Sequence, residues 1–104
     1  MKVKEDKILG YLGLATKAGQ IVSGEFMTEK AIKEGNAKVV IVAQDASDNT
    51  KEMFRNKCEY YNVPIYIFGD KDKIGHAMGK QFRASVAITD DGFAKAIKKQ
   101  FEVK

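Results

Sequence analysis

Hydrophobic residues along the chain follow two spacings, one helical and one typical of buried strands. Near the N-terminus, four apolar residues share one face at the 3.6-residue period and predict a helix over residues 5–18: Ile8, Leu9, Leu12 and Ala15. We expect Gly10 and Gly13, inside this helix, to mark close packing against a neighbour. The run Val39–Ala43 is continuously apolar and mostly β-branched, as in strands covered on both faces.

The complete pattern predicts five helices and four strands in strict alternation. The predicted helices cover residues 5–18, 25–34 and 50–61, a short segment that is capped by Asp70 or Asp72 and runs to residue 78, and a last segment capped by Asp90-Asp91. The predicted strands cover residues 21–23, 39–43, 65–68 and 84–89. Because helical crossovers separate the strands, we expect mostly parallel pairing with helices on both faces. The predicted fold class is therefore α/β, a three-layer α/β/α sandwich of about four strands that forms a single domain over residues 1–104.

Composition removes several classes of function. The single cysteine, Cys58, excludes a disulfide framework, and with one histidine, His76, the chain lacks the ligands of a zinc site. No stretch approaches 18 apolar residues, and the first six residues lack the apolar core of a signal peptide. These features predict a cytoplasmic protein without a cofactor. The net charge of +4 suggests a polyanionic partner but does not by itself establish one.

Residues suited to catalysis are scarce. A nucleophile needs a base within reach, and His76 is the only histidine, on a short predicted helix where a surface role is ordinary. Cys58 falls at a core-facing helical position, where cysteine behaves as a small apolar residue. We therefore predict no enzymatic activity.

One acidic pair leaves a second possibility open. Asp45 and Asp48 follow a buried strand, where α/β sheets place ligands, and two carboxylates there suit Mg²⁺ in a phosphate-handling module. The ordinary alternative is that Asp45 binds loop backbone while Asp48 or Asn49 caps the next helix.

Short motifs run in order through nearly the whole chain. They are Gly24, Lys30-Ala31, Gly35, a strand ending in Ala43-x-Asp45, the segment Cys58–Pro64, and Gly75, Gly79 and Ala84–Ile88. In this order the set resembles ribosomal proteins of the 7Ae and 30e type, the family that binds kink-turn RNA. Leu12–Gly19 is similar to the opening of the family's bacterial YlxQ-like branch. The resemblance independently implies an α/β/α sandwich.

The resemblance implies two RNA-binding segments. In the first, Gly24 and the start of the next helix would enter the bend of the RNA, with Lys30 and Lys33 neutralising phosphates. In the second, Phe82 would stack on an unpaired base, flanked by Lys80 and Arg83. The implied set is Ser23, Gly24, Glu25, Phe26, Thr28, Lys30, Lys33, Lys80, Phe82 and Arg83. The implied partner is a structured RNA, ribosomal RNA or a kink-turn element, bound by a monomer that contacts no membrane.

The sequence departs from the family at Phe26 and Met27. Many kink-turn binders have Asn or Lys, then Glu or Gln, at these positions, and those side chains read the guanines of sheared G·A pairs. Phe and Met make no such hydrogen bonds. Either Glu25 takes over this work, or the readout is looser, or kink-turn binding is lost and the fold serves as a protein-interaction adaptor. Core packing of Phe26 and Met27 is the ordinary alternative to any role on the surface.

Overall fold

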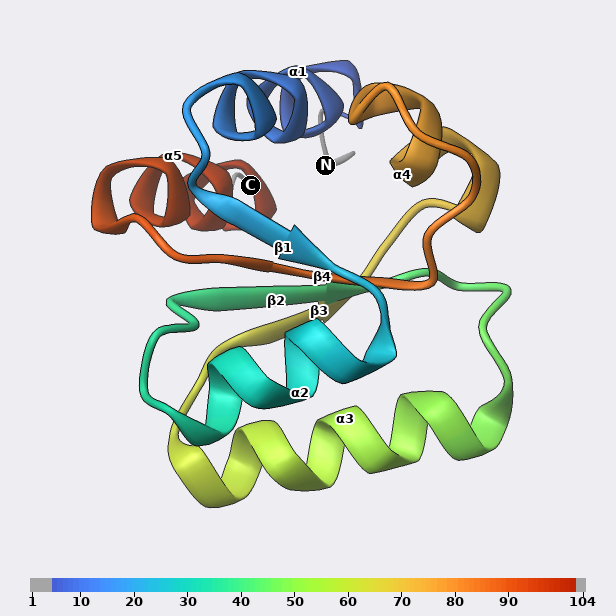
Figure 1. Ribbon diagram of the computed structural model, residues 1–104, viewed down its shortest axis with the longest axis vertical. Helices are drawn as coiled ribbons and strands as arrows, with labels where there is room; N and C mark the ends of the chain where they lie inside the picture. The colour runs from blue at the N-terminus through green and yellow to red at the C-terminus, as the bar shows by residue number, and fades with distance from the viewer. Residues whose placement is uncertain (1–4, 103–104) are drawn as a thin grey trace.

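The computed structural model describes residues 5–102, so residues 1–4 and 103–104 lie outside the description. Nine elements alternate along the chain (Figure 1): α1 (Glu5–Lys17), β1 (Ile21–Ser23), α2 (Glu25–Lys33), β2 (Val39–Val42), α3 (Asp48–Tyr61), β3 (Ile65–Ile67), α4 (Lys71–Ala77), β4 (Ser85–Ile88) and α5 (Asp91–Phe101). The predicted order is confirmed, and most boundaries move by one or two residues. Within the described residues, no helix is both long and apolar enough to cross a membrane.

Local side chains decide where three of the helices begin. Asp70 and Asp90 cap α4 and α5 by accepting hydrogen bonds from the backbone N–H groups of Lys73 and Phe93, at 2.8 and 2.9 Å. The predicted cap of α3 is wrong. Ser47 caps this helix, with its Oγ accepting from the Thr50 N–H at 3.1 Å, and α3 therefore begins two residues earlier than predicted.

The four strands form one sheet in the order β1-β4-β2-β3. Only β2 and β3 pair in parallel, whereas β4 runs antiparallel to both β1 and β2. The predicted mostly parallel pairing is therefore wrong, although β1, β2 and β3 do share one direction. The single reversed strand, β4, lies between β1 and β2 and breaks up the parallel set.

The reversal of β4 follows from the short excursion that precedes it. Helix α4 has seven residues, and the chain then folds back along it, so that the Arg83 N–H donates to the Lys71 carbonyl at 3.0 Å. The chain thus returns to the end of the sheet at which β3 finishes, and β4 starts from that end. A longer crossover would carry the chain to the opposite ends of the strands and give a parallel strand.

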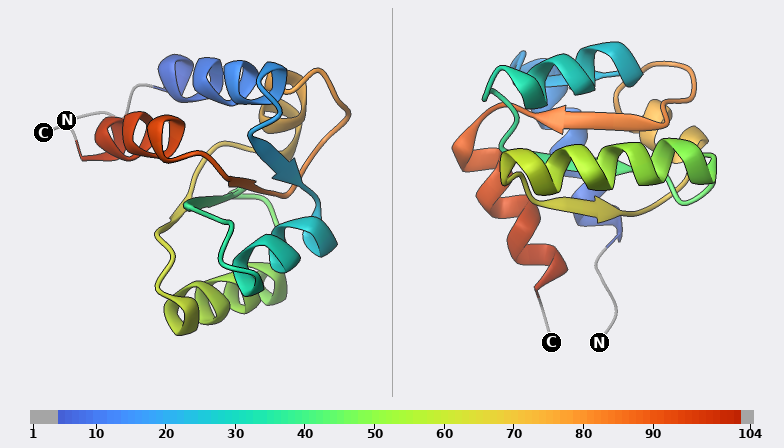
Figure 2. Two further views of the ribbon diagram at one scale, coloured as in Figure 1. Left: turned by 60° about the vertical axis from the view of Figure 1, so that its left-hand side comes forward. Right: turned by 90° about the horizontal axis from the view of Figure 1, so that it is seen from below.

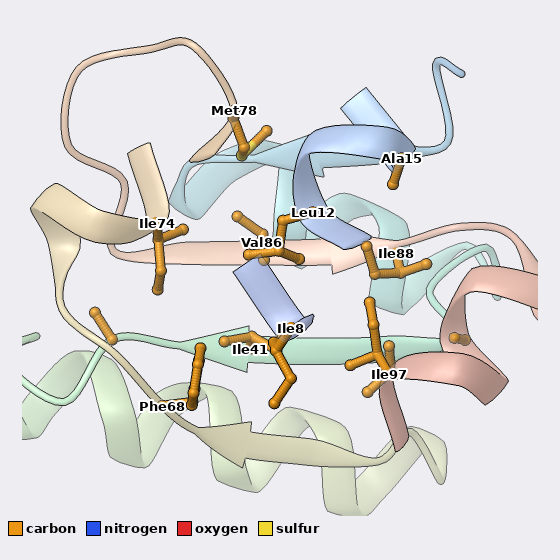
Figure 3. Close-up of a cluster of buried hydrophobic side chains, with 13 residues drawn as sticks. Ile8, Leu12, Ala15, Ile41, Phe68, Ile74, Met78, Val86, Ile88 and Ile97 are labelled. Atoms are coloured by element: carbon orange, nitrogen blue, oxygen red, sulfur yellow. The ribbon is translucent and has the colours of Figure 1, made fainter. Parts of the chain in front are cut away.

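Helices cover both faces of the sheet, which confirms the three-layer sandwich. Figure 2 shows α2 and α3 on one face and α1, α4 and α5 on the other. Successive residues of β2 point to opposite faces, with Val39 and Ile41 in one cluster and Val40 and Val42 in the other. In the larger cluster, side chains from three helices converge on β2 and β4 (Figure 3): Ile8, Leu12, Ile74 and Ile97 meet Ile41, Val86 and Ile88.

Helix α1 packs closely against α4 at one of its two glycines. A Cβ atom built at Gly13 would lie 3.0 Å from the Ala77 carbonyl oxygen, so the expected close packing is confirmed there. At Gly10 the expectation is wrong, since a Cβ atom would meet nothing within 4 Å. Lys73 adds an ion pair to the same helix pair, with its Nζ 3.2 Å from Glu5 Oε1.

Candidate nucleic-acid interface

One edge of the sheet gathers the loops that the sequence singled out. The carboxyl ends of β1, β2 and β3 meet the beginning of β4 at this edge, where the orange chain in Figure 1 enters the sheet. Backbone hydrogen bonds join the loops: Gly24 N–H to Ser85 O at 2.9 Å, and Ala43 N–H to Ala84 O at 2.8 Å. The segments around Gly24 and Phe82, about 60 residues apart in sequence, are therefore neighbours.

Gly24 sets the conformation at the start of α2. Its φ of +92° is one that residues with a Cβ atom rarely adopt, so the backbone itself requires glycine here. The first hydrogen bond within the helix runs from Thr28 N–H to Gly24 O, and no side chain caps this end. The backbone N–H groups of Glu25, Phe26 and Met27 therefore have no partner within the helix. Such an end favours an anion.

Helix α2 presents an unusually apolar first turn to solvent. Phe26 is 73% exposed and Met27 is 43% exposed, so the alternative in which they pack in the core is wrong. Glu25 is exposed beside them. Further along the helix, Lys30 and Lys33 are exposed and border one shallow hollow together with Phe26.

Thr28 lies on the opposite side of α2. It is fully buried, and its Oγ1 has no hydrogen-bond partner in the described structure. Residues Ala31 and Ile32 bury the same side of the helix. A contact between the Thr28 side chain and RNA does not fit this position, so Thr28 is left out of the interface proposed below.

The loop from Gly79 to Ala84 presents an aromatic ring to solvent. Phe82 is 62% exposed, and Lys71 Nζ lies 5.9 Å from the centre of its ring. Lys80 is exposed in the same loop. On one side, Phe82 and Lys80 border an open hollow of about 660 Å³ between α1 and α4.

Arg83 points to the neighbouring loop. Its Nε donates to Ser23 Oγ at 3.0 Å, and its Nη1 donates to the Phe82 carbonyl at 3.0 Å. No carboxylate of residues 5–102 lies within 4 Å of its guanidinium nitrogens. The two expected RNA-binding segments are thus joined by a side chain as well as by backbone.

Charge is distributed unevenly between the two segments. Residues 24–38 carry three lysines and three glutamates, and Lys30 lies 3.8 Å from Glu34 in a solvent-exposed pair. Residues 69–83 carry four basic residues against two aspartates. The electrostatic attraction for a phosphate backbone is therefore centred on α4 and the loop that follows it.

Asp45 and Asp48 do not form a metal site in the described structure. Asp45 Oδ1 accepts the backbone N–H of Lys71 at 3.0 Å, so this carboxylate binds backbone, but at the first residue of α4 and not in a loop. Asp48 is fully exposed at the start of α3, 3.9 Å from Lys51 Nζ. No cluster of three metal-ligating side chains occurs among residues 5–102. The contacts of Asp45 and Asp48 in the described structure thus give no support to the magnesium hypothesis.

The two residues considered for catalysis lie apart. His76 is exposed on α4, and Cys58 is 1% exposed on the buried side of α3. Burial raises the pKa of the Cys58 thiol from its ordinary value of 9.0 to about 11. The thiol thus stays protonated at neutral pH and packs as a small apolar group.

The raised pKa predicts a loss of stability in alkali. Between pH 9 and pH 11 the unfolded chain releases the Cys58 proton while the folded chain keeps it, so the free energy of unfolding falls by on the order of 2 kcal/mol. Below pH 9 the contribution is constant. Urea unfolding of wild type and Cys58→Ala at several pH values measures the difference. Parallel pH profiles for the two proteins would contradict the prediction.

Lys71 is a further candidate residue of this interface, which the sequence does not single out. The linear pattern places it in a short helix, and nothing in that pattern places it beside Phe82. The ring contact arises only because the chain folds back along α4. The one available signal was its place directly after the helix cap Asp70, at the carboxyl end of a strand.

An α/β/α sandwich whose joined loops expose a helix N-terminus, an aromatic ring and several cations has the features of a nucleic-acid-binding module. The sequence profile of the ribosomal protein L7Ae/L30e/S12e/Gadd45 family matches residues 6–98. The chain belongs to this family.

Individual relatives agree with this assignment. The chain is 42% identical to the RNA-binding protein YlxQ of Bacillus subtilis (strain 168) over 86 residues, covering 83% of this chain and 86% of that protein. It is 40% identical to the RNA-binding protein YlxQ of Enterococcus faecium over 96 residues, 92% of each chain. A solved structure of a protein with unknown function from Bacillus halodurans C superimposes with a TM-score of 0.90 at 31% identity, covering 98% of this chain and 100% of that one.

Proposed function

We propose that this protein is a cytoplasmic, non-catalytic RNA-binding domain that recognises a structured RNA of kink-turn type, in ribosomal RNA or in a ribosome-associated RNA. The observation that carries the proposal is the direct junction of the Gly24 and Phe82 segments at one edge of the sheet. A sharply bent RNA presents closely spaced phosphates and an unstacked base on one side, and the two segments offer a complementary group for each.

The start of α2 supplies the phosphate contact. The unpartnered N–H groups after Gly24 carry the positive end of the helix dipole, which suits a phosphate oxygen. The absence of a side chain at Gly24 leaves the backbone open to a close approach. Lys30 and Lys33 extend this contact along the exposed face of the helix.

The Phe82 loop supplies the contact with an unpaired base. Its exposed ring offers a flat apolar surface, and base–aromatic stacking contributes about 1–3 kcal/mol per base. The adjoining hollow of about 660 Å³ gives a flipped-out nucleotide room beside the ring. Lys71 and Lys80 place positive charge near the phosphates of that nucleotide.

The exposed Phe26 and Met27 limit the contacts that the first turn of α2 can make with sheared G·A pairs. Neither side chain accepts or donates the hydrogen bonds that read guanine edges. Glu25, exposed in the same turn, is the nearby acceptor. We therefore propose that shape and stacking determine recognition at this turn, with Glu25 as its one polar reader.

A titration against two RNAs tests the proposal. One is a standard kink-turn, and the other is the same RNA with its sheared G·A pairs replaced by Watson–Crick pairs, each at two salt concentrations. We expect tighter binding to the kink-turn and an affinity that falls steeply with salt, because bound phosphates release counterions. Equal binding to both RNAs would contradict kink-turn recognition, and binding to neither would contradict RNA binding.

Two substitutions are expected to separate the contacts. Phe82→Ala should weaken binding about 5- to 150-fold on RNAs with a flipped-out base and much less on RNAs without one, because only the stacked base loses its partner. Lys30→Ala should weaken binding to every RNA and reduce the salt slope by about one. Fluorescence anisotropy at four salt concentrations measures both effects.

Tyr60→Ala is the matched control for Phe82→Ala. Tyr60 is also an exposed aromatic residue, 80% exposed, but it lies near the end of α3, away from the Gly24 and Phe82 loops. Its removal is expected to leave RNA affinity unchanged. Equal losses for Phe82→Ala on all RNAs would exclude the base-stacking role.

A protein-interaction adaptor is the second candidate function. The observation that favours it is the joint exposure of three large apolar side chains, Phe26 and Met27 in the first turn of α2 and Phe82 in the loop before β4. In that case an apolar protein segment would cover the three residues. Binding that is insensitive to salt and absent for both RNAs would favour the adaptor.

A further inference from the structure

We propose that Arg83 is a positioning residue, which holds Phe82 ready for its ligand by bonding to Ser23. This inference rests on the proposed function and assigns Arg83 and Ser23 a role within it. The observation behind it is that two of the three guanidinium nitrogens already have protein partners. Nε bonds to the Ser23 hydroxyl, and Nη1 bonds to the backbone carbonyl of Phe82 itself.

The loop that carries Phe82 is held on three sides. The Arg83 N–H donates to the Lys71 carbonyl at 3.0 Å, which ties the loop to the first residue of α4. A Cβ atom at Gly75 would lie 2.7 Å from Phe82 Cα, so the loop lies directly on the α4 backbone. The third contact is the hydrogen bond from the Arg83 guanidinium to Ser23 at the end of β1.

This arrangement has a consequence for affinity. An exposed aromatic ring on a mobile loop loses conformational entropy when it binds, and that cost weakens the complex. A loop that is already fixed avoids most of this cost. The bond from Arg83 to Ser23 also sets the separation of the two RNA-binding segments, because Ser23 directly precedes Gly24.

Ser23 allows a test that leaves the positive charge in place. In Ser23→Ala the hydrogen bond is lost while Arg83 keeps its charge. We expect kink-turn affinity to fall about five- to tenfold, as for the loss of one partly buried hydrogen bond, with an unchanged dependence on salt. Ser23→Thr keeps a hydroxyl and is expected to restore most of the affinity.

A double-mutant cycle distinguishes positioning from direct contact. If Ser23 acts through Phe82, then Ser23→Ala causes little further loss in a Phe82→Ala background. Losses that simply add would overturn the proposal, because they would mean that Ser23 touches the RNA independently. Lys80→Ala serves as the control, since an exposed lysine that meets phosphate reduces the salt slope and adds to the loss from Phe82→Ala.

A second readout needs no RNA. Exchange of the backbone amide at position 83 reports on the bond to the Lys71 carbonyl, and, corrected for the intrinsic rate of each sequence, we expect it to be at least several-fold faster in Ser23→Ala and Arg83→Ala than in wild type. Unchanged exchange in both variants would overturn the positioning role. If wild type binds neither RNA, the proposed function fails, and the exchange experiment still decides whether Arg83 holds the loop.

Discussion

Replacing Gly75 by alanine is expected to lower the free energy of unfolding by about 3 kcal/mol and to weaken RNA binding as well. Gly75 is buried in α4, and a Cβ atom there would lie 2.5 Å from the Gln81 carbonyl carbon and 2.7 Å from Phe82 Cα. These are backbone atoms, so no flexible side chain can yield. The returning loop has to move away from the helix, and Phe82 moves with it.

Gly10→Ala is the matched control. Gly10 is also a helical glycine, but it is exposed, and a Cβ atom there meets nothing within 4 Å. Alanine is the better helix former, so this variant is expected to be more stable by about 0.5–1 kcal/mol. Gly10 borders the hollow beside Phe82, so the variant is a control for stability only. Urea unfolding of both variants measures the effect on stability, and RNA titration of Gly75→Ala measures the effect on binding. A Gly75→Ala protein as stable as wild type would show that the loop does not lie on the helix as described.

Phe54→Ala is expected to lower the free energy of unfolding by about 3–5 kcal/mol. Phe54 is fully buried on α3 and is the largest of the fully buried side chains. It packs between α3, α2 and the face of the sheet that includes Val40 and Val42. The substitution removes apolar contacts and leaves a cavity that the surrounding strands cannot easily close.

Arg55→Ala, at the next and exposed position of the same helix, is the control and is expected to change stability by less than about 0.5 kcal/mol. Chemical denaturation of both variants measures the difference. The folded fraction of Phe54→Ala should keep its RNA affinity within about twofold, since neither RNA-binding loop contains this residue. If the free energy of unfolding fell by less than about 1 kcal/mol, the prediction would be wrong, because the residues around position 54 would then have closed around the smaller side chain.

Gly75→Ala and Phe54→Ala are expected to differ in whether they affect RNA binding as well as stability. Phe54 supports the layer of α2 and α3 as a whole, and its loss affects folding. Gly75 supports the position of one loop, and its loss affects folding and the interface together. Comparing stability with affinity across these variants therefore locates the functional surface without a structure of the complex.

The α/β class, the order of the nine elements and their bounds to within one or two residues were predictable from the sequence, because they depend on local patterns. The continuous apolar run at Val39–Ala43 identified a strand buried on both faces. Asp70 or Asp72, and the pair Asp90-Asp91, marked two helix starts, at which Asp70 and Asp90 are the caps. The motifs from Gly24 to Ile88 indicated the family, which the comparisons confirm. Each of these motifs, caps and apolar runs consists of residues that are close together along the chain.

Only the tertiary structure decided how distant segments meet. The antiparallel placement of β4 depends on the turn-back of the chain after α4, which no local pattern encodes. The burial of Thr28 and the exposure of Phe26 depend on which side of α2 faces the sheet. The bond from Arg83 to Ser23 and the position of Lys71 beside Phe82 join residues that the sequence keeps apart. Local propensity therefore determined the elements of this protein, whereas packing between elements determined its candidate interface, because side-chain contacts across loops exist only once the sheet has assembled.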